Sequence, residues 1–209
     1  MTDVAHSKEP IRLFKSDFLE FFTHVSPVTV LVIYLPVIGY ALVRGIRGLP
    51  AGVSWLVLPA GFVLGLILWT LTEYLLHRFL FHFKPRTPWQ ERISFLFHGV
   101  HHAQPMVKTR LVMPPVVSIP LALLFYGLFT LVFTALGAAY WIAPTFAGFG
   151  LGYVLYDMTH YSLHHFKLRW GYFNTIRLHH MRHHGQTPNQ RFGVTNVVWD
   201  KVFGTYPRE

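Results

Sequence analysis

The histidines of this chain are concentrated in a few short stretches. Residues 156–184, YDMTHYSLHHFKLRWGYFNTIRLHHMRHH, contain seven of the fourteen histidines and directly follow an apolar run of membrane length. His160 and His164 are four residues apart, so on a helix both imidazoles leave the same face, one turn apart. Imidazole nitrogens gathered in this way suit metals such as iron or zinc. The pattern predicts a metal site.

Ten of the histidines form two matching sets, one in each half of the chain. Each set has a pair at the end of an apolar run and a His-x-x-His-His triplet further on. The first set is His77, His82, His98, His101 and His102, and the second is His160, His164, His180, His183 and His184. We expect a quasi-repeat that holds two metal ions, with each ion drawing ligands from both halves.

The first pair has a different spacing from the second. His77 and His82 are five residues apart, which is roughly 140° around a regular α-helix, so this spacing predicts one of them for each ion. His165 and His179 are next to candidate ligands but do not follow their spacing along the helix. We expect them to support ligands or to lie at the surface. A role without metal is disfavoured, because each buried imidazole nitrogen without a partner costs roughly 1–3 kcal/mol.

The composition is that of a small integral membrane protein. Of the 209 residues, 52% are hydrophobic and only 13% are charged, which is too apolar for an ordinary soluble domain. The chain has no cysteine, so any metal must be held by nitrogen and oxygen ligands. The net charge of +9 would indicate nucleic acid only with a basic face on a soluble module. No such module is visible, and we expect no nucleic-acid partner.

Four apolar runs have about the ~20 residues that a helix needs to cross a bilayer. They lie near residues 25–43, 53–76, 116–136 and 138–155. The short connections within each pair predict two helical hairpins. The expected fold is therefore an all-α integral membrane protein with four transmembrane helices and a cytoplasmic helical cap that carries the histidine-rich dimetal site. The expected divisions are a polar segment at 1–24, a single membrane-embedded domain at 25–209, and histidine boxes at 77–110 and 156–206.

The N-terminal segment has its own pattern. From Ile11 to Val25 apolar residues recur at steps of three and four, with charged residues on the other faces. This spacing predicts an interfacial amphipathic helix. A polar segment that simply leads into the first span is the alternative.

Positive charge predicts the orientation in the membrane. With four spans, the N-terminus, the central loop and the C-terminal segment lie on one side and contain sixteen of the eighteen Lys and Arg residues. Arg44 and Arg47 lie on the other side. By the positive-inside rule the histidine side is cytoplasmic, where a basic face meets anionic lipid headgroups.

Two acids and a tyrosine near the histidines are further candidates for the site. Glu73 lies one turn before His77, and Asp157 lies three residues before His160. A charge at the end of a span needs a partner, and holding the second ring nitrogen of a ligand histidine is the role that we expect for both acids. Direct metal coordination is the alternative. Tyr156 packs or hydrogen-bonds near the site, or is a core aromatic residue.

Four longer phrases around these residues resemble a known family. EYLLHRFLFH, RLVMPP, GYVLYDMTHYSLHH and FGVTNVVWDKVFGTY are similar to the fatty acid 2-hydroxylase branch of the membrane fatty acid hydroxylase superfamily, over roughly residues 73–206. The resemblance implies a four-span protein with a ten-histidine dimetal centre, two non-haem iron ions that zinc is able to replace in purified protein, and dioxygen as co-substrate. The matching ligand positions are the same ten histidines that spacing selects.

The resemblance also implies a substrate and a partner. The substrate is a long-chain fatty acid or a sphingolipid-type acyl group, hydroxylated at carbon 2. Many members of the branch carry a cytochrome b5-type haem domain with a His-Pro-Gly-Gly motif, which this sequence lacks. We therefore expect a separate electron-donor protein of the cytochrome b5 or ferredoxin type, and a bacterial inner membrane in preference to the endoplasmic reticulum.

Two other functions remain open. A desaturase or sterol-type oxidase of the same superfamily would use the same histidine boxes. A histidine-rich membrane protein that binds or transports metal belongs to another class. A transporter places polar residues near the middle of its spans, whereas these histidines gather at one end.

Overall fold

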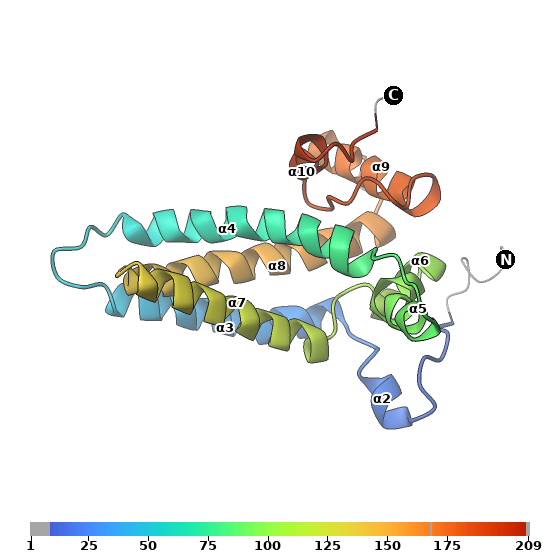
Figure 1. Ribbon diagram of the computed structural model, residues 1–209, viewed down its shortest axis with the longest axis horizontal. Coiled ribbons are helices and arrows are strands. Elements are labelled where there is room, and N and C mark those ends of the chain that lie inside the picture. Colours follow the sequence, from blue (N-terminus) through green and yellow to red (C-terminus); the bar gives the residue numbers. More distant parts are fainter. Residues whose placement is uncertain (1–8, 168, 208–209) are drawn as a thin grey trace. The chain divides into compact units, whose positions relative to one another are not determined.

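The computed structural model describes residues 9–167 and 169–207, and its regular elements within these ranges are all helical (Figure 1). In chain order they are α2 (Asp17–Phe21), α3 (Pro27–Arg47), α4 (Val57–Leu75), η1 (Leu76–Phe81), α5 (Pro88–Ser94), η2 (Phe95–Gly99), α6 (Val100–Ala103), η3 (Lys108–Arg110), α7 (Pro115–Ala135), η4 (Ala139–Trp141), α8 (Ile142–His165), α9 (Gly171–Gly185) and α10 (Val198–Val202). The elements η1 and η2 are π-helical turns, and η3 and η4 are 3-10 turns.

The chain divides into two compact units, and both α4 and α8 contribute to each of them. The helical unit consists of Pro27–Thr70 and Met113–Leu155. Within it α3, α7 and the apolar parts of α4 and α8 run side by side (Figure 1). The histidine unit consists of Met1–Ser26, Leu71–Val112 and Tyr156–Glu209. It contains all ten histidines that the sequence selects as ligands.

Three of the expected spans are helices long and apolar enough to cross a membrane. Within the described residues these helical stretches are Pro27–Arg47, Val57–Phe81 and Lys108–Ala135, and the chain is a multi-pass membrane protein. The remaining run, expected at 138–155, begins with the 3-10 turn η4 and continues as α8 to His165. This one helix therefore joins an apolar segment to a segment rich in histidine.

Two glycines allow α4 and α8 to touch through their backbones in the helical unit. A Cβ atom added to Gly148 would lie 1.9 Å from the carbonyl oxygen of Phe62, and one added to Gly65 would lie 2.1 Å from that of Thr145. Small residues at such contacts are the usual means of close helix packing in membranes, where apolar lipid gives helices little hydrophobic reason to associate.

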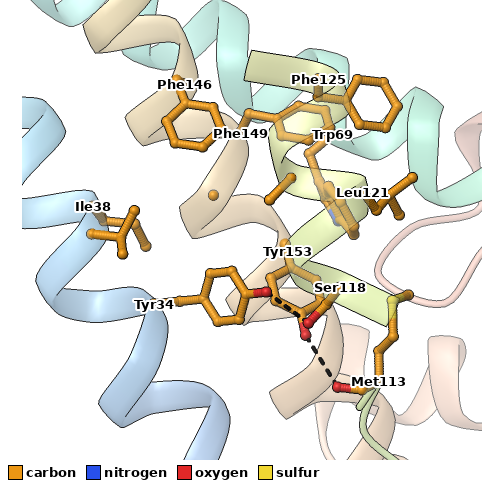
Figure 2. A pocket seen from close by; sticks show the side chains of 13 residues that line it. Tyr34, Ile38, Trp69, Met113, Ser118, Leu121, Phe125, Phe146, Phe149 and Tyr153 are labelled. Atoms are coloured by element: carbon orange, nitrogen blue, oxygen red, sulfur yellow. Dashed lines mark hydrogen bonds between the residues drawn. The ribbon is translucent and has the colours of Figure 1, made fainter. Parts of the chain in front are cut away.

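A small apolar pocket lies between the helices of the helical unit (Figure 2). Its lining includes Trp69, Phe125 and Phe149. Tyr34 and Ser118 also line it, and their hydroxyl groups are joined by a hydrogen bond of 2.6 Å. The cavity volume is about 30 Å³, which is enough for ordered water.

The N-terminal segment is helical over a shorter stretch than the sequence predicts. Only α2 forms a helix there. The backbone amides of Leu13 and Phe14 donate to Glu20 Oε2, each at 2.9 Å, and the buried Arg110 donates to the carbonyl of Ile11 and to Glu20. These contacts replace the helical hydrogen bonds of residues 11–14. The predicted amphipathic helix is wrong for that part of the segment.

The α4–α8 contact is tested by Gly148→Ala. We expect this variant to lose about 1–3 kcal/mol of stability, because an overpacked interface forces backbones apart. Thermal unfolding in detergent measures the loss as a lower Tm. The control is Gly127→Ala in α7, where an added Cβ meets nothing within 4 Å. Equal Tm values for the two variants would contradict the close contact.

Candidate metal centre

Among the described residues, the ten histidines converge in two groups of five. The first group is His77, His82, His98, His102 and His183, and the second group is His101, His160, His164, His180 and His184. In each group one ring nitrogen from every member lies within 4.8 Å of the others. The first group takes His183 from the second half of the chain, and the second group takes His101 from the first half. Each group therefore combines residues of both halves, as a shared pair of metal sites requires.

The spacing of the ring nitrogens fits one metal ion in each group. Neighbouring Nε2 atoms are 3.1 Å apart in the first group and 2.9–3.1 Å apart in the second. Two nitrogens held about 90° apart, each about 2.1 Å from an ion, are separated by about 3.0 Å, whereas a tetrahedral ion separates them by about 3.4 Å. The groups therefore suit an ion with five or six ligands better than a tetrahedral one.

Two π-helical turns arrange the first group. In η1 the amide of His82 donates to the carbonyl of His77 at 3.1 Å, and this i→i+5 bond brings residues five apart onto one face. The ring centroids of the two histidines are 5.0 Å apart, and both belong to the first group. The prediction that they serve different ions is wrong, because it assumed a regular α-helix. His98 comes from the second π-turn, η2.

The second group is built from regular helical spacing. His160 and His164 on α8, and His180 and His184 on α9, are i,i+4 pairs that share a face. His101 joins the two helices, because its Nε2 is 3.0 Å from those of both His160 and His184. The rings of His102 and His184, one from each group, stack with centroids 4.2 Å apart. The two groups are thus adjacent.

Burial keeps these imidazoles neutral. Burial removes the water that would stabilise a charged ring, and this holds the pKa of His98 and that of His101 well below the usual value. Repulsion from the neighbouring imidazoles is the second cause. The same causes lower the pKa of His82 to about 3, and burial lowers the pKa of His183 to about 4. A metal ion binds the neutral imidazole, so at pH 7 these rings are in the form that coordinates.

Two backbone carbonyls fix the tautomers of the first group. His77 Nδ1 donates to the carbonyl of Phe192 at 2.5 Å, and His183 Nδ1 donates to the carbonyl of Gln190 at 2.7 Å. A carbonyl only accepts hydrogen bonds, so the ring proton is on Nδ1 in both residues. Their Nε2 atoms are therefore free to bind a metal ion.

Glu73 has a different role from the expected one. Its Oε1 accepts from the amides of Val194 and Thr195, each at 2.8 Å, and its Oε2 accepts from Thr195 Oγ1 at 2.6 Å. The second nitrogen of His77, its expected partner, is held by Phe192 instead. The prediction for Glu73 is wrong because one backbone segment, more than 100 residues further along the chain, binds both side chains. Its amides at 194 and 195 bind the carboxyl group of Glu73, and its carbonyl at 192 binds the ring of His77.

Tyr156 and Asp157 are both buried beside the second group. The ring of Tyr156 stacks on that of His160, with centroids 5.8 Å apart. This contact is aromatic packing against a candidate ligand. Asp157 is 0% exposed, and its role as the partner of a ring nitrogen stays a prediction.

Sequence reasoning missed Asp200. Its Oδ2 accepts from His179 Nε2 at 3.0 Å, and its Oδ1 accepts from Thr205 Oγ1 at 2.7 Å. Burial acts to raise the pKa of Asp200, but the hydrogen bonds from His179, Thr205 and the Gly193 amide outweigh it and hold the pKa below its usual value. His179 thus supports the C-terminal segment, and His165 packs on Tyr161 outside both groups. An acid inside the apolar phrase VVWDKVFG was the available signal.

Comparison with known proteins agrees with this geometry. Residues 62–205 match the model of the family described as fatty acid hydroxylase. The chain is 38% identical over 201 residues to the dihydroceramide fatty acyl 2-hydroxylase FAH1 of Arabidopsis thaliana, covering 96% of this chain and 82% of that protein. It is 42% identical over 194 residues to the ceramide very long chain fatty acid hydroxylase SCS7 of Saccharomyces cerevisiae, covering 91% of this chain and 48% of that protein.

A solved structure has the same fold. It is described as full-length scs7p with only the hydroxylase domain visible, and it aligns with a TM-score of 0.82 and 40% identity over 92% of this chain and 70% of that chain. The fold and the site define a membrane-embedded lipid hydroxylase. The chain belongs to the fatty acid hydroxylase family.

Low pH is expected to destabilise the metal-free protein. The pKa values of His82 and His183 in the folded state, about 3 and about 4, lie below the 6.5 of a free imidazole. Between about pH 6.5 and 4 the unfolded chain therefore binds more protons, and the free energy of unfolding decreases as the pH falls through this window. Thermal unfolding in detergent at about pH 7, 6 and 5 measures the effect. His82→Ala should show a smaller decrease, and a constant Tm would contradict neutral buried rings.

Proposed function

We propose that this protein hydroxylates carbon 2 of a long-chain fatty acyl group, as a free acid or in a sphingolipid-type lipid, with dioxygen as co-substrate. The observation that carries the proposal is the pair of five-histidine groups in a chain that belongs to the fatty acid hydroxylase family. The relatives named above act on dihydroceramide fatty acyl groups and on ceramide very long chain fatty acids. The first relative is a 2-hydroxylase, which supports the position of hydroxylation, and both relatives support the class of substrate.

The ten histidines are proposed to hold two iron ions, five ligands to each ion. Imidazole nitrogen suits iron, and it also suits zinc, which would bind the same residues in purified protein. Each group offers five donors, more than the four of a usual tetrahedral zinc site, which supports iron as the working metal. Bound iron supplies the oxidation chemistry with dioxygen that an unactivated carbon–hydrogen bond needs.

The protein's own residues prepare the site for these ions. Burial keeps the rings of His98 and His101 neutral. The carbonyls of Phe192 and Gln190 hold the ring protons of His77 and His183 on Nδ1, which leaves Nε2 of both rings free for a metal ion. The same burial keeps bulk water from the donor atoms. Each ion would therefore meet ligands that are already deprotonated and oriented.

The membrane arrangement is proposed from the sequence together with the three apolar helices. Four spans, with α8 as the fourth, leave the histidine boxes on one side of the bilayer. Sixteen of the eighteen Lys and Arg residues then lie on that side, which supports a cytoplasmic site. A bacterial inner membrane and an electron donor of the cytochrome b5 or ferredoxin type stay predictions.

The function is tested by lipid mass spectrometry of cells that express the protein, the His98→Ala variant or the His183→Ala variant. We expect a 2-hydroxy acyl product with the intact protein, and a decrease of roughly 100-fold or more in both variants, because loss of even an outer partner of a ligand costs about 10–100-fold and these variants lose a ligand itself. The control is His165→Gln, a histidine outside both groups, which should retain the product.

Membrane insertion of each variant is checked by its abundance in the membrane fraction. Retained product in His98→Ala or His183→Ala at normal abundance would contradict the catalytic role of the groups. A new double bond or an oxidised sterol, in place of the 2-hydroxy product, would move the function to a desaturase or a sterol-type oxidase.

A further inference from the structure

The segment Gln190–Thr195, here called the strap, has contacts on both sides of its backbone. On one side, the carbonyls of Gln190 and Phe192 accept from Nδ1 of His183 and His77. The strap itself contains no member of either histidine group. Its contribution to the site is therefore made by backbone atoms, whose positions depend on how the segment is held.

Two buried carboxylates hold four successive amides of the strap. The amides of Phe192 and Gly193 donate to Oδ1 and Oδ2 of Asp200, each at 2.8 Å. The next two amides, of residues 194 and 195, donate to Oε1 of Glu73, each at 2.8 Å. Asp200 is 0% exposed and Glu73 is 2% exposed. Each of the four amides is thus hydrogen-bonded to a buried carboxyl group, so both ends of this run of amides are fixed.

The strap also has little freedom to change its path. A Cβ atom added to Gly193 would lie 1.9 Å from the carbonyl oxygen of Asn196 and 2.9 Å from Asp200 Oδ2. Arg191 has a positive φ of 62°, which non-glycine residues adopt rarely and only where the surroundings impose it. The Arg191 amide is held by the carbonyl of Thr205 at 3.0 Å.

The strap serves one histidine group and not the other. His77 and His183 both belong to the first group. In the second group, the buried Nδ1 atoms of His101, His180 and His184 have no hydrogen-bond partner within the described part of the chain, and a backbone hydrogen bond with Leu111 supports His160. A hydrogen bond to the second ring nitrogen fixes the orientation of a ligand and raises its basicity, and its loss typically reduces metal affinity 10–100-fold.

We propose that the strap is a positioning element of the first histidine group alone, so that the two metal ions are held with unequal affinity and the first group retains its ion longer. Asp200 and Glu73 act through the strap carbonyls on His183 and His77. The inference rests on the proposed metal binding by these histidines, but not on which lipid is oxidised.

The experiment is a chelator titration of the full chain, purified in detergent and loaded with zinc. Bound zinc per chain is measured by mass spectrometry at increasing EDTA concentration. We expect two ions that leave in two steps, separated by 10–100-fold in EDTA concentration. His164→Ala, which removes a ligand of the second group, should abolish the easily released ion. His82→Ala should abolish the tightly held one.

Thr195→Val tests the strap with a small change. It removes the hydroxyl that donates to Glu73 Oε2 at 2.6 Å and should shift only the tighter step to lower EDTA concentration. Thr195→Ser keeps a hydroxyl and should restore the wild-type titration. The matched control is Thr175→Val on the exposed face of α9, which should leave both steps unchanged. Asp200→Asn should have a larger effect in the same direction as Thr195→Val.

Two results would overturn the inference. One is a single release step for both ions in the intact protein, and the other is a tighter step that survives His82→Ala or stays unchanged in Thr195→Val. A protein that binds no zinc at all would contradict the proposed metal centre itself, which is a separate outcome from equal affinity of two bound ions.

Discussion

The structure depends on the close, buried packing of imidazole nitrogens, which a bound cation would convert into a set of ligands. In the first group Nε2 of His77 lies 3.1 Å from Nε2 of His98, and Nε2 of His183 lies 3.1 Å from Nε2 of His82. Because His77 and His183 carry their protons on Nδ1, their Nε2 atoms present lone pairs to these neighbours. Without a metal ion each lone pair needs an Nε2–H donor from a neighbouring ring, and a ring with two close Nε2 neighbours, such as His98, is able to donate to only one of them. Buried acceptors without a donor cost roughly 1–3 kcal/mol each. A metal ion between them converts the same lone pairs into ligands.

This requirement explains several local features of the fold. The π-turn η1 breaks the regular helix at the point where His77 and His82 must share a face, and π-turns are frequent at functional sites for such reasons. The exchange of His101 and His183 between the groups ties the two halves of the chain together. Two buried acidic side chains, Glu73 and Asp200, fix backbone amides, and these hydrogen bonds offset the cost of burying polar groups.

The sequence was sufficient for the residues that follow simple periodicity. The i,i+4 pairs of α8 and α9 place His160, His164, His180 and His184 correctly, because regular helices keep that spacing on one face. Sequence could not assign His77 and His82, since a π-turn changes the period and has no clear sequence signal. It also misassigned Glu73, because the partner of that acid is the backbone of a segment distant in sequence. Hydrogen bonds to carbonyls, such as that of Phe192, leave no trace in side-chain patterns.

The central claim is that each group of five histidines holds one metal ion and that each ion draws ligands from both halves of the chain. Anomalous X-ray diffraction from crystals of the metal-loaded protein tests it directly. The account predicts two peaks, one next to Nε2 of His183 together with four histidines of the first half, and the other next to His101 together with four of the second half. A single peak, or an ion held only by residues before Val116, would contradict it.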